Sequence, residues 1–349
     1  KFRVYSMNKI KIKNLNLPQI VAEAGINHNG SLKNAFKMIE IAKNSGATAI
    51  KFQTFKAKEF IADNSLMYSY FSKGKKITKS QMELFKKCEF SKEEWLKISK
   101  KCNDEKIMFL STPENKSDLD LLVELKVKAI KVSSDEIINL PFLNEISKTK
   151  LPIIISSGMS NLKEIDNALK TIGTFNGYPT ILLVTTSEYP TPLNHVNLRK
   201  FEMFKEKFPF LPLGISDHTQ GHLTAAMACV YGSVFFEKHF TISHNLTGPD
   251  HWFSENPKGL KEWINAIQNA HIILGSKIVK PTKIELKNKN DFRRKIVAIK
   301  SIKKGEVFDL EKIGLRRTNH RMGLDPYFLK KILNKKSKIN YQKGQLIKL

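Results

Sequence analysis

The stretch IVAEAGINHNG (Ile20–Gly30) sets the pattern of the chain, because a short apolar run holding one acid, Glu23, leads into a turn of glycine and asparagine. An amphipathic segment follows, and seven further apolar runs repeat the alternation. The expected strands are Ile20–Ala24, Ala49–Gln53, Ile107–Ser111, Ala129–Val132, Ile153–Ser156, Ile181–Thr185, Leu213–Ser216 and Val234–Lys238. Continuous apolar strands that alternate with helices predict parallel strands covered by helices.

The segments between these strands have helical periodicity. The expected helices are Leu32–Asn44, Lys92–Asn103, Ser117–Leu125, Phe142–Lys148, Leu162–Ile172, Asn197–Lys207, Leu223–Tyr231 and Gly259–Leu274. Eight strand–helix units are the number that closes a (β/α)8 TIM barrel, an α/β fold. An open doubly wound sheet is the alternative, although no GxGxxG motif follows the first strand, which argues against dinucleotide binding.

The chain is expected to divide into a barrel domain (1–280), a linker (281–292) and a small separate domain (293–349). Pro281 and a polar run mark the linker, and the last domain shows a short strand at Lys295–Ala298. Within the barrel, Thr54–Lys106 is too long for one helix, so Met67–Ser80 is predicted as a loop at the strand-end face, serving as a lid or binding loop. Met7 is the expected native start, with an expression remnant before it.

The charge balance is strongly positive, with 59 Lys+Arg, 33 Asp+Glu and a net charge of +26. The last 57 residues alone carry +13, which invites a polyanionic partner. Only seven of the cations are arginine, however, and lysine is a solvated point charge rather than a fork that recognises bases or phosphates.

Cysteine usage and hydropathy indicate in which cellular compartment the protein is expected. The three scattered cysteines form no disulfide framework and no metal spacing, which favours the cytoplasm. The N-terminus lacks the apolar core of a signal peptide. No apolar run approaches the roughly 18 residues of a membrane span.

Polar residues stand at the carboxyl end of every predicted strand, the face on which barrel enzymes build their sites. They are Glu23, Lys51, Gln53, Ser111–Pro113, Lys131–Glu136, Ser156–Gly158, Thr185–Tyr189, Ser216–His218 and Glu237–His239. Two strand lysines with neighbouring hydroxyls predict a cradle for phosphate or carboxylate. Two histidines can hold a divalent metal, and Glu23 and Glu237 can orient hydroxyls or move protons. A lone strand-end lysine is more often a surface or ion-paired residue than a ligand, and the other residues alone could be helix caps or turns, but their coincidence on one face favours a site.

Eight motifs in unbroken order resemble the sialic acid synthase family. They are AEAGINHNGS (Ala22–Ser31), KFQTFKA (Lys51–Ala57), STP (Ser111–Pro113), SSGM (Ser156–Met159), EYPTP (Glu188–Pro192), SDHT (Ser216–Thr219), EKHFT (Glu237–Thr241) and TGPDH (Thr247–His251). RRKIVAIKSIKKGEVF (Arg293–Phe308) is similar to that family's antifreeze-like (SAF, β-clip-type) domain. The resemblance implies condensation of phosphoenolpyruvate with an N-acetylated hexosamine, such as N-acetylmannosamine, to a nine-carbon sialic acid and phosphate by C–O cleavage.

The resemblance also implies roles for individual residues. His218 and His239 would bind a divalent metal, with Mn²⁺ ahead of Mg²⁺ or Co²⁺. The expected catalytic groups are Glu23, Lys51, Lys131 and Glu237, of which the lysines also hold phosphoenolpyruvate. The expected substrate-binding residues are Ser134, Ser156, Ser216, Thr112 and Ser187 for phosphoenolpyruvate, and Gln53, Tyr189 and Asp250 for the sugar, beside Glu237. Arg317 would reach the sugar's N-acetyl group from the partner chain of a domain-swapped homodimer.

The sequence departs from the family pattern at several substrate loops. Glu114 follows STP where the family has Phe, and Ser133-Ser134-Asp135-Glu136 replaces Gly-Ser-Gly-Glu. Val184-Thr185-Thr186 replaces His-Cys-Thr, and Thr318 replaces the Pro after Arg317. These changes leave the identity of the sugar open between N-acetylmannosamine and its diacetamido-dideoxy or diacetamido-trideoxy relatives, the last of which would lead to N,N'-diacetyllegionaminate.

Two other functions are alternatives to the synthase. A non-catalytic polyanion binder would use the basic tail, but the tail lacks interleaved stacking aromatics. Condensation of phosphoenolpyruvate with an aldose phosphate would need extra cations where Gly248-Pro249-Asp250-His251 stands. The expected partners are therefore phosphoenolpyruvate, an N-acetylated hexosamine and a second copy of the chain, not nucleic acid or membrane.

Overall fold

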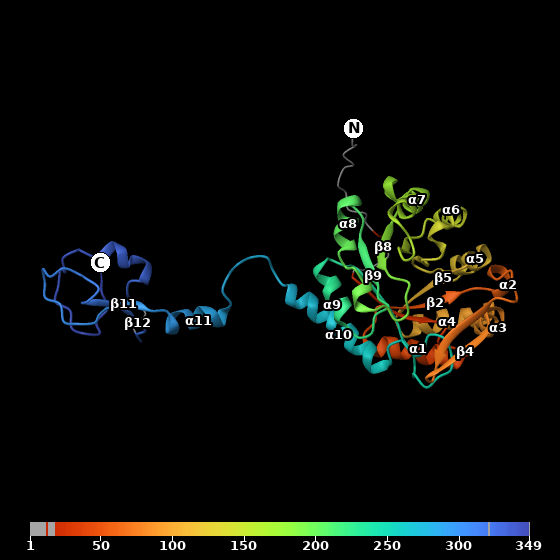
Figure 1. Cartoon of the computed structure of the whole chain (residues 1–349), viewed down its shortest axis with the longest axis horizontal. Coiled ribbons are helices and arrows are strands. Elements are labelled where there is room, and N and C mark those ends of the chain that lie inside the picture. The colour runs from red at the N-terminus through yellow and green to blue at the C-terminus, as the bar shows by residue number, and fades with distance from the viewer. Residues whose placement is uncertain (1–11, 13–17, 320–321, 349) are drawn as a thin grey trace. The chain divides into compact units, whose positions relative to one another are not determined.

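The computed structural model describes residue 12, residues 18–319 and residues 322–348. The chain forms two compact units, Lys1–Gly275 and Ser276–Leu349, and each is described by itself (Figure 1). The expected start at Met7 lies outside the described residues.

Within the described residues, eight parallel strands make the sheet of the first unit. They are β1 (Gln19–Gly25), β2 (Ala49–Thr54), β5 (Met108–Pro113), β6 (Ile130–Val132), β7 (Ile153–Ser156), β8 (Thr180–Thr185), β9 (Leu213–Ser216) and β10 (Phe235–His239). The order is β5-β2-β1-β10-β9-β8-β7-β6, and the two outer members, β5 and β6, also contact each other. The sheet is therefore a near-closed barrel rather than an open doubly wound sheet, and each predicted strand overlaps an observed one.

Helices surround the ring of strands (Figure 1). They are α1 (Leu32–Ser45), α4 (Lys92–Asp104), α5 (Lys116–Glu124), α6 (Leu140–Lys148), α7 (Leu162–Ile172), α8 (Lys200–Lys207), α9 (Leu223–Val230) and α10 (Pro257–Leu274). All eight were predicted, but α8 begins three residues later than expected. Asn197 has φ +52°, which is incompatible with a helical residue, so the helix cannot start there.

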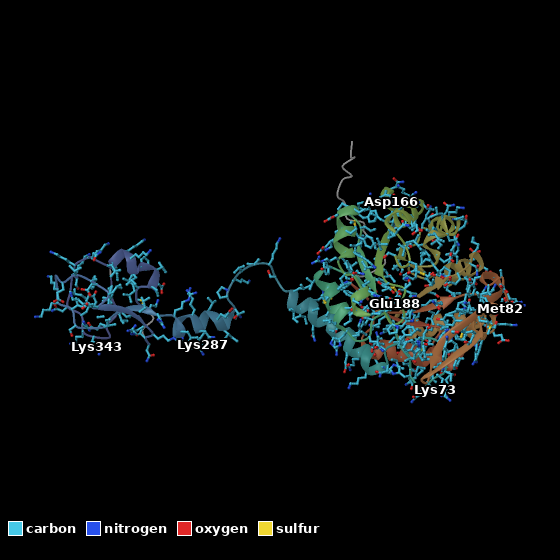
Figure 2. The ribbon with its side chains drawn as sticks, in the orientation of Figure 1. Lys73, Met82, Asp166, Glu188, Lys287 and Lys343 are labelled. Carbon is cyan, nitrogen blue, oxygen red and sulfur yellow. The ribbon has the colours of Figure 1, made fainter. Side chains whose placement is uncertain are left out.

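The prediction of a loop over Met67–Ser80 is wrong, because this segment is a β-hairpin of β3 (Met67–Ser72) and β4 (Lys75–Ser80). Its two-residue turn, Lys73-Gly74, has positive φ at both positions, as tight hairpin turns require. Short helices α2 (Ala57–Phe60) and α3 (Gln81–Cys88) flank it. Figure 2 shows Lys73 at the periphery of the first unit.

The interior of the ring is filled by an apolar layer in which every side chain is fully buried. Its members are Val21, Ala49, Leu110, Ala129, Ile154, Ile181, Leu183 and Phe235. Side chains two positions apart on a strand share a face, so the next inward residues toward the carboxyl ends are polar. These are Glu23, Lys51, Thr112, Lys131, Ser156, Thr185 and Glu237. The strand period thus places the polar groups directly above the apolar layer.

The second unit holds its own small core around Ile296, Ile302 and Ile313. Its strands β11 (Lys295–Ala298), which matches the predicted strand, and β12 (Ile313–Arg316) pair antiparallel. Helix α11 (Lys283–Phe292) occupies the segment expected as a linker, and α12 (Leu329–Ile332) is a single turn. Figure 2 shows the lysine side chains of this unit, Lys287 and Lys343 among them. No helix within the described residues is both long and apolar enough for a membrane span.

Gly214 of β9 tests how tightly the ring interior is packed. A Cβ added there would lie 2.5 Å from Leu183 Cδ2 and 2.7 Å from the Phe235 backbone oxygen. Because that oxygen belongs to the sheet and cannot move, Gly214→Ala is expected to destabilise the first unit by about 3 kcal/mol, the upper end of overpacking costs. Urea unfolding followed by tryptophan fluorescence measures this unit, since Trp95, Trp252 and Trp263 all lie in it.

Gly74→Ala is the control for that measurement. Gly74 has φ +73° but nothing within 4 Å of an added Cβ, so only the backbone cost of about 1 kcal/mol applies. Equal losses in the two variants would contradict a rigidly packed interior.

Candidate active site

Four charged residues predicted to be catalytic meet inside the barrel. Glu23, Lys51, Lys131 and Glu237 are each no more than 3% exposed. Lys51 Nζ lies 2.9 Å from Glu23 Oε1 and 3.8 Å from Glu237 Oε1, and Lys131 Nζ lies 3.8 Å from the same Glu237 oxygen. The two cations and two anions compensate one another, which buried charges require.

The second oxygens of Glu23 and Glu237 have no hydrogen-bond partner among the described residues although they are buried. Burial raises the pKa of Glu23 to about 7, even though Lys51 pulls it down, and burial lowers the pKa of Lys131 to about 8. Burial also raises the pKa of Glu237, but Lys131 and Lys51 outweigh it and hold that pKa below its usual value. Glu23 and Lys131 therefore both gain or lose a proton near neutral pH, which suits acid–base catalysis.

Hydroxyl groups from neighbouring strands surround the two lysines. Lys51 Nζ donates to Thr112 Oγ1 at 3.3 Å, and Lys131 Nζ donates to Ser156 Oγ at 2.7 Å. Ser216 Oγ donates to Glu237 Oε1 at 2.9 Å. The predicted phosphate-cradle residues Thr112, Ser156 and Ser216 are thus brought together with the lysines, an arrangement that suits an anion.

Ser134 and Ser187 crowd against Gly158, in the loop after β7. A Cβ on Gly158 would lie 2.2 Å from Ser187 Oγ and 2.6 Å from Ser134 Oγ, so the two hydroxyls converge only because this residue is glycine. Ser187 Oγ is buried without a hydrogen-bond partner in the described part of the chain. Such a group has its bonding capacity available for a ligand.

The two predicted metal ligands, His218 and His239, lie side by side with ring centroids 5.6 Å apart. His218 Nδ1 donates to Thr186 O at 2.8 Å, so the lone pair of this ring is on Nε2, which lies 3.2 Å from Ser216 Oγ. His239 Nδ1 is buried and lacks a hydrogen-bond partner among the described residues. Burial lowers the pKa of His218 to about 4 and the pKa of His239 well below its usual value, so both rings are neutral. Two neutral imidazoles side by side, each with a ring nitrogen that can act as a ligand, fit a divalent transition metal.

A cluster of carboxylates that sequence reasoning did not assemble lies at the next strand ends. Glu114, Asp135 and Glu136 each offer one oxygen, and these oxygens all lie within 4.8 Å of one another, close enough to share a cation. Burial, together with Asp135 and Glu136, raises the pKa of Glu114 well above its usual value. Glu114 and Asp135 are both departures from the family pattern, so two of the departures lie next to each other.

A cavity of about 500 Å³ opens over these groups. Its lining includes the predicted residues Gln53, Ser134, Ser187, Tyr189, His239 and Asp250. Burial raises the pKa of Asp250 to about 7, and the Tyr189 ring centroid lies 4.2 Å from that of His218. Gln53, Tyr189 and Asp250, three of the sugar-site residues implied by the resemblance, therefore face a single cavity, whereas Glu237 is not part of its lining.

The cavity wall also contains residues that sequence reasoning missed. Phe55, Phe60 and Phe85 pack edge to face, with centroids 5.2–5.7 Å apart, and Tyr68 comes from the hairpin. The length of Thr54–Lys106 signalled a binding segment, but no local pattern singled out these rings. These rings make part of the cavity wall apolar, whereas other parts of the wall carry charged residues.

The comparisons with known proteins agree with this geometry. The profile of the NeuB family matches residues 38–279. The chain belongs to the NeuB family. This confirms the resemblance to the sialic acid synthases.

Three similar proteins illustrate the breadth of the match. The N,N'-diacetyllegionaminic acid synthase of Campylobacter jejuni is 41% identical to this NeuB chain, over 94% of the chain and 98% of that protein. The enzyme of the same name from Legionella pneumophila is 36% identical, over 93% and 92%. The crystal structure of N-acetylneuraminic acid synthetase from Leptospira borgpetersenii, with citrate, has a TM-score of 0.70 and 30% identity, covering 82% of this chain and 98% of that one.

Arg317 of this NeuB chain lies in the second unit. Its Nε donates to Phe292 O at 3.1 Å, and its guanidinium sits 5.5 Å from the centroid of the Phe292 ring. Its expected role at the sugar stays a prediction.

The acidic cluster generates a test on stability. The pKa of Glu114 is higher in the folded chain than in the unfolded one, so its contribution to stability is fully present below about pH 4.5 and is lost as pH rises toward the folded pKa. Glu114→Gln removes that loss. We expect the variant to melt a few degrees above the wild type at pH 8, with the gain shrinking to nothing near pH 4.5. Glu202→Gln, an exposed acid on α8, is the control, and a gain independent of pH would contradict the assignment.

Proposed function

We propose that this chain condenses phosphoenolpyruvate with an N-acetylated hexosamine and water, and releases a nine-carbon sialic acid and phosphate by C–O cleavage. The observation that carries the proposal is the pair of buried lysines, each bonded to a hydroxyl of a neighbouring strand. A compact dianionic metabolite matches such a cradle, since preorganised cations and hydroxyls stabilise phosphate and carboxylate groups in a site shielded from water. Membership of the NeuB family supports the same chemistry.

The sugar we favour is a diacetamido-trideoxyhexose, which gives N,N'-diacetyllegionaminate, with N-acetylmannosamine as the second candidate. Two relatives named for this product are 41% and 36% identical to the chain. Glu114 offers a carboxyl acceptor for the N–H of a second acetamido group, which N-acetylmannosamine lacks. The wall of Phe55, Phe60 and Phe85 suits a deoxy methyl group better than a hydroxyl, because a hydroxyl would lose its water there.

The chain's own residues account for each part of the reaction. Lys51 and Lys131, with Thr112 and Ser156, hold the phosphate and carboxylate while C3 of phosphoenolpyruvate forms a bond with the aldehyde carbon of the open-chain sugar. The aldehyde oxygen takes up a proton, which Glu23 can supply because its pKa is about 7. The carboxylates Glu23 and Glu237 stabilise positive charge at C2 until water adds there and returns a proton to Glu23. The new C2 hydroxyl then gives its proton to the departing phosphate as the C–O bond breaks and the C2 carbonyl forms.

His218 and His239 would hold the divalent metal, which when bound supplies Lewis-acid polarisation of the aldehyde. The orientation of His218 depends on its bond to Thr186 O, which fixes Nδ1 as the donor and leaves Nε2 for the metal. The domain-swapped homodimer, and Arg317 acting on the N-acetyl group, belong to the same proposal.

A substrate panel tests the proposed function. The purified chain, phosphoenolpyruvate and Mn²⁺ are incubated with N-acetylmannosamine or with the diacetamido-trideoxyhexose, and phosphate release and product mass are measured. We expect release with both, fastest with the diacetamido sugar, and none after EDTA. No release with either sugar would contradict the proposal.

Ser156, the last residue of β7, and Ser157, which follows it, provide a matched pair for the cradle. Ser156 Oγ accepts from Lys131 Nζ, whereas Ser157 Oγ donates to Leu183 O at 2.8 Å. Ser156→Ala is expected to raise the KM for phosphoenolpyruvate about tenfold, which corresponds to roughly 1.4 kcal/mol for one charged hydrogen bond. Steady-state kinetics of Ser157→Ala should show a KM near the wild type, and equal effects of the two substitutions would count against the cradle.

A further inference from the structure

An ion pair on the outer side of the barrel lies between the residues that form the site. Asp217 stands between Ser216 and His218, and Lys238 stands between Glu237 and His239. Lys238 lies within β10, whose neighbouring residues face opposite sides, and Asp217 contacts Trp263 of the surrounding helix α10, so both side chains lie on the outer side of the barrel. Lys238 Nζ lies 2.9 Å from Asp217 Oδ2, and each residue is 2% exposed.

The Asp217 carboxylate receives four hydrogen bonds. Oδ2 accepts from Lys238 Nζ and from Trp263 Nε1 at 3.0 Å. Oδ1 accepts from the backbone N of Thr219 at 3.0 Å and from Thr219 Oγ1 at 2.7 Å. Lys238 Nζ also donates to Thr219 O. The network therefore joins β10, the loop after β9 and helix α10, which carries Trp263.

This network lies where the backbone pairing ends. The two strands share the partners Phe236↔Ile215 and Glu237↔Ser216, and the bond from Asp217 N to Glu237 O at 2.8 Å follows. His239 is still paired with Glu23 of β1, but His218 lies beyond the end of β9, so the sheet alone does not fix the distance between their rings. Two side-chain contacts join the segments that carry them: the hydrogen bond from Ser216 Oγ to Glu237 Oε1 on the cavity side and the Asp217–Lys238 ion pair on the outer side.

We propose that the Asp217–Lys238 ion pair, anchored by Trp263, is a positioning device that sets the geometry of His218 and His239 for a divalent cation. The inference rests on the proposed function, which assigns the metal to these histidines. A buried ion pair adds little net stability compared with an apolar pair of the same shape, so its contribution here is geometric. Asp217 and Lys238 touch no substrate and act only through their neighbours.

The test is Mn²⁺ binding to the full-length, metal-free chain, measured by electron paramagnetic resonance without phosphoenolpyruvate or sugar. Asp217→Asn removes the charge at constant shape and is expected to weaken binding about 10–100-fold, as loss of a partner that orients a metal ligand does. Trp263→Phe removes one hydrogen bond and weakens binding less. Trp95→Phe is the matched control, because Trp95 is a buried tryptophan of α4 that packs against Phe52, Phe90 and Phe109. The Mn²⁺ affinity of this variant should stay at the wild-type value.

Two further measurements separate positioning from folding. In the double variant Asp217→Asn/Lys238→Met, neither charge of the pair remains, and Glu255, 4.0 Å from Lys238 Nζ, keeps its hydrogen bond from Gly221 N, so we expect most of the melting temperature to recover while Mn²⁺ affinity stays weak. If Asp217→Asn does not fold, the Mn²⁺ affinity of Trp263→Phe is compared with that of Trp95→Phe to test the proposal. Wild-type affinity in Asp217→Asn, equal weakening by the two tryptophan variants, or recovery of affinity together with stability would each overturn the proposal.

A failure of the proposed function gives a different result. If His218→Ala binds Mn²⁺ as the wild type does, the histidines are not the metal site. The ion pair is then judged from the imidazole NMR signals of His218 and His239 in the metal-free chain. These signals must shift in Asp217→Asn and Trp263→Phe but not in Trp95→Phe, and unshifted signals would refute the positioning role.

Discussion

The structure depends on placing two positive and two negative charges inside a parallel barrel. Glu23, Lys51, Lys131 and Glu237 compensate one another at 2.9–3.8 Å, and removing any one would leave an uncompensated buried charge, a loss of about 3–5 kcal/mol. Each lies two residues beyond a member of the apolar layer that fills the ring. The apolar layer excludes water from the amino-terminal side of these charges. A ligand can therefore reach them only from the carboxyl ends of the strands.

Much of this arrangement could be predicted from the sequence because parallel strands are buried on both faces. Their apolar runs are nearly continuous, so a lysine or glutamate inside one, such as Lys51 or Glu237, stands out at once. The hairpin at Met67–Ser80 could not be found in this way. Its strands are largely exposed, so their alternation is weak, and its turn is Lys73-Gly74 rather than the Asn-Gly or Asp-Gly that signals a tight hairpin.

Contacts between distant segments were the other part that the sequence did not reveal. Trp263 meets Asp217 from a position 46 residues away, and Glu114 meets Asp135 from the loop after a different strand. Local patterns show that a residue is polar, but not which side of a strand end it faces, because the backbone leaves the regular pleat there. The sequence therefore identified Asp217 and Lys238 only as members of their motifs and predicted no contact between them.

The division between strands and loops explains how one framework can serve several sugars. The residues proposed to hold phosphoenolpyruvate and metal lie mainly on strands or directly after them, tied by ion pairs and hydrogen bonds to neighbouring strands. Glu114, Ser133 and Asp135, which depart from the family pattern, lie on the cavity wall, and so do Tyr68 and the phenylalanines. Under the proposed function, a change on that wall would alter which substituent is accepted without disturbing the buried charges. The choice of sugar would then belong to the loops, and the ring of strands would stay the same.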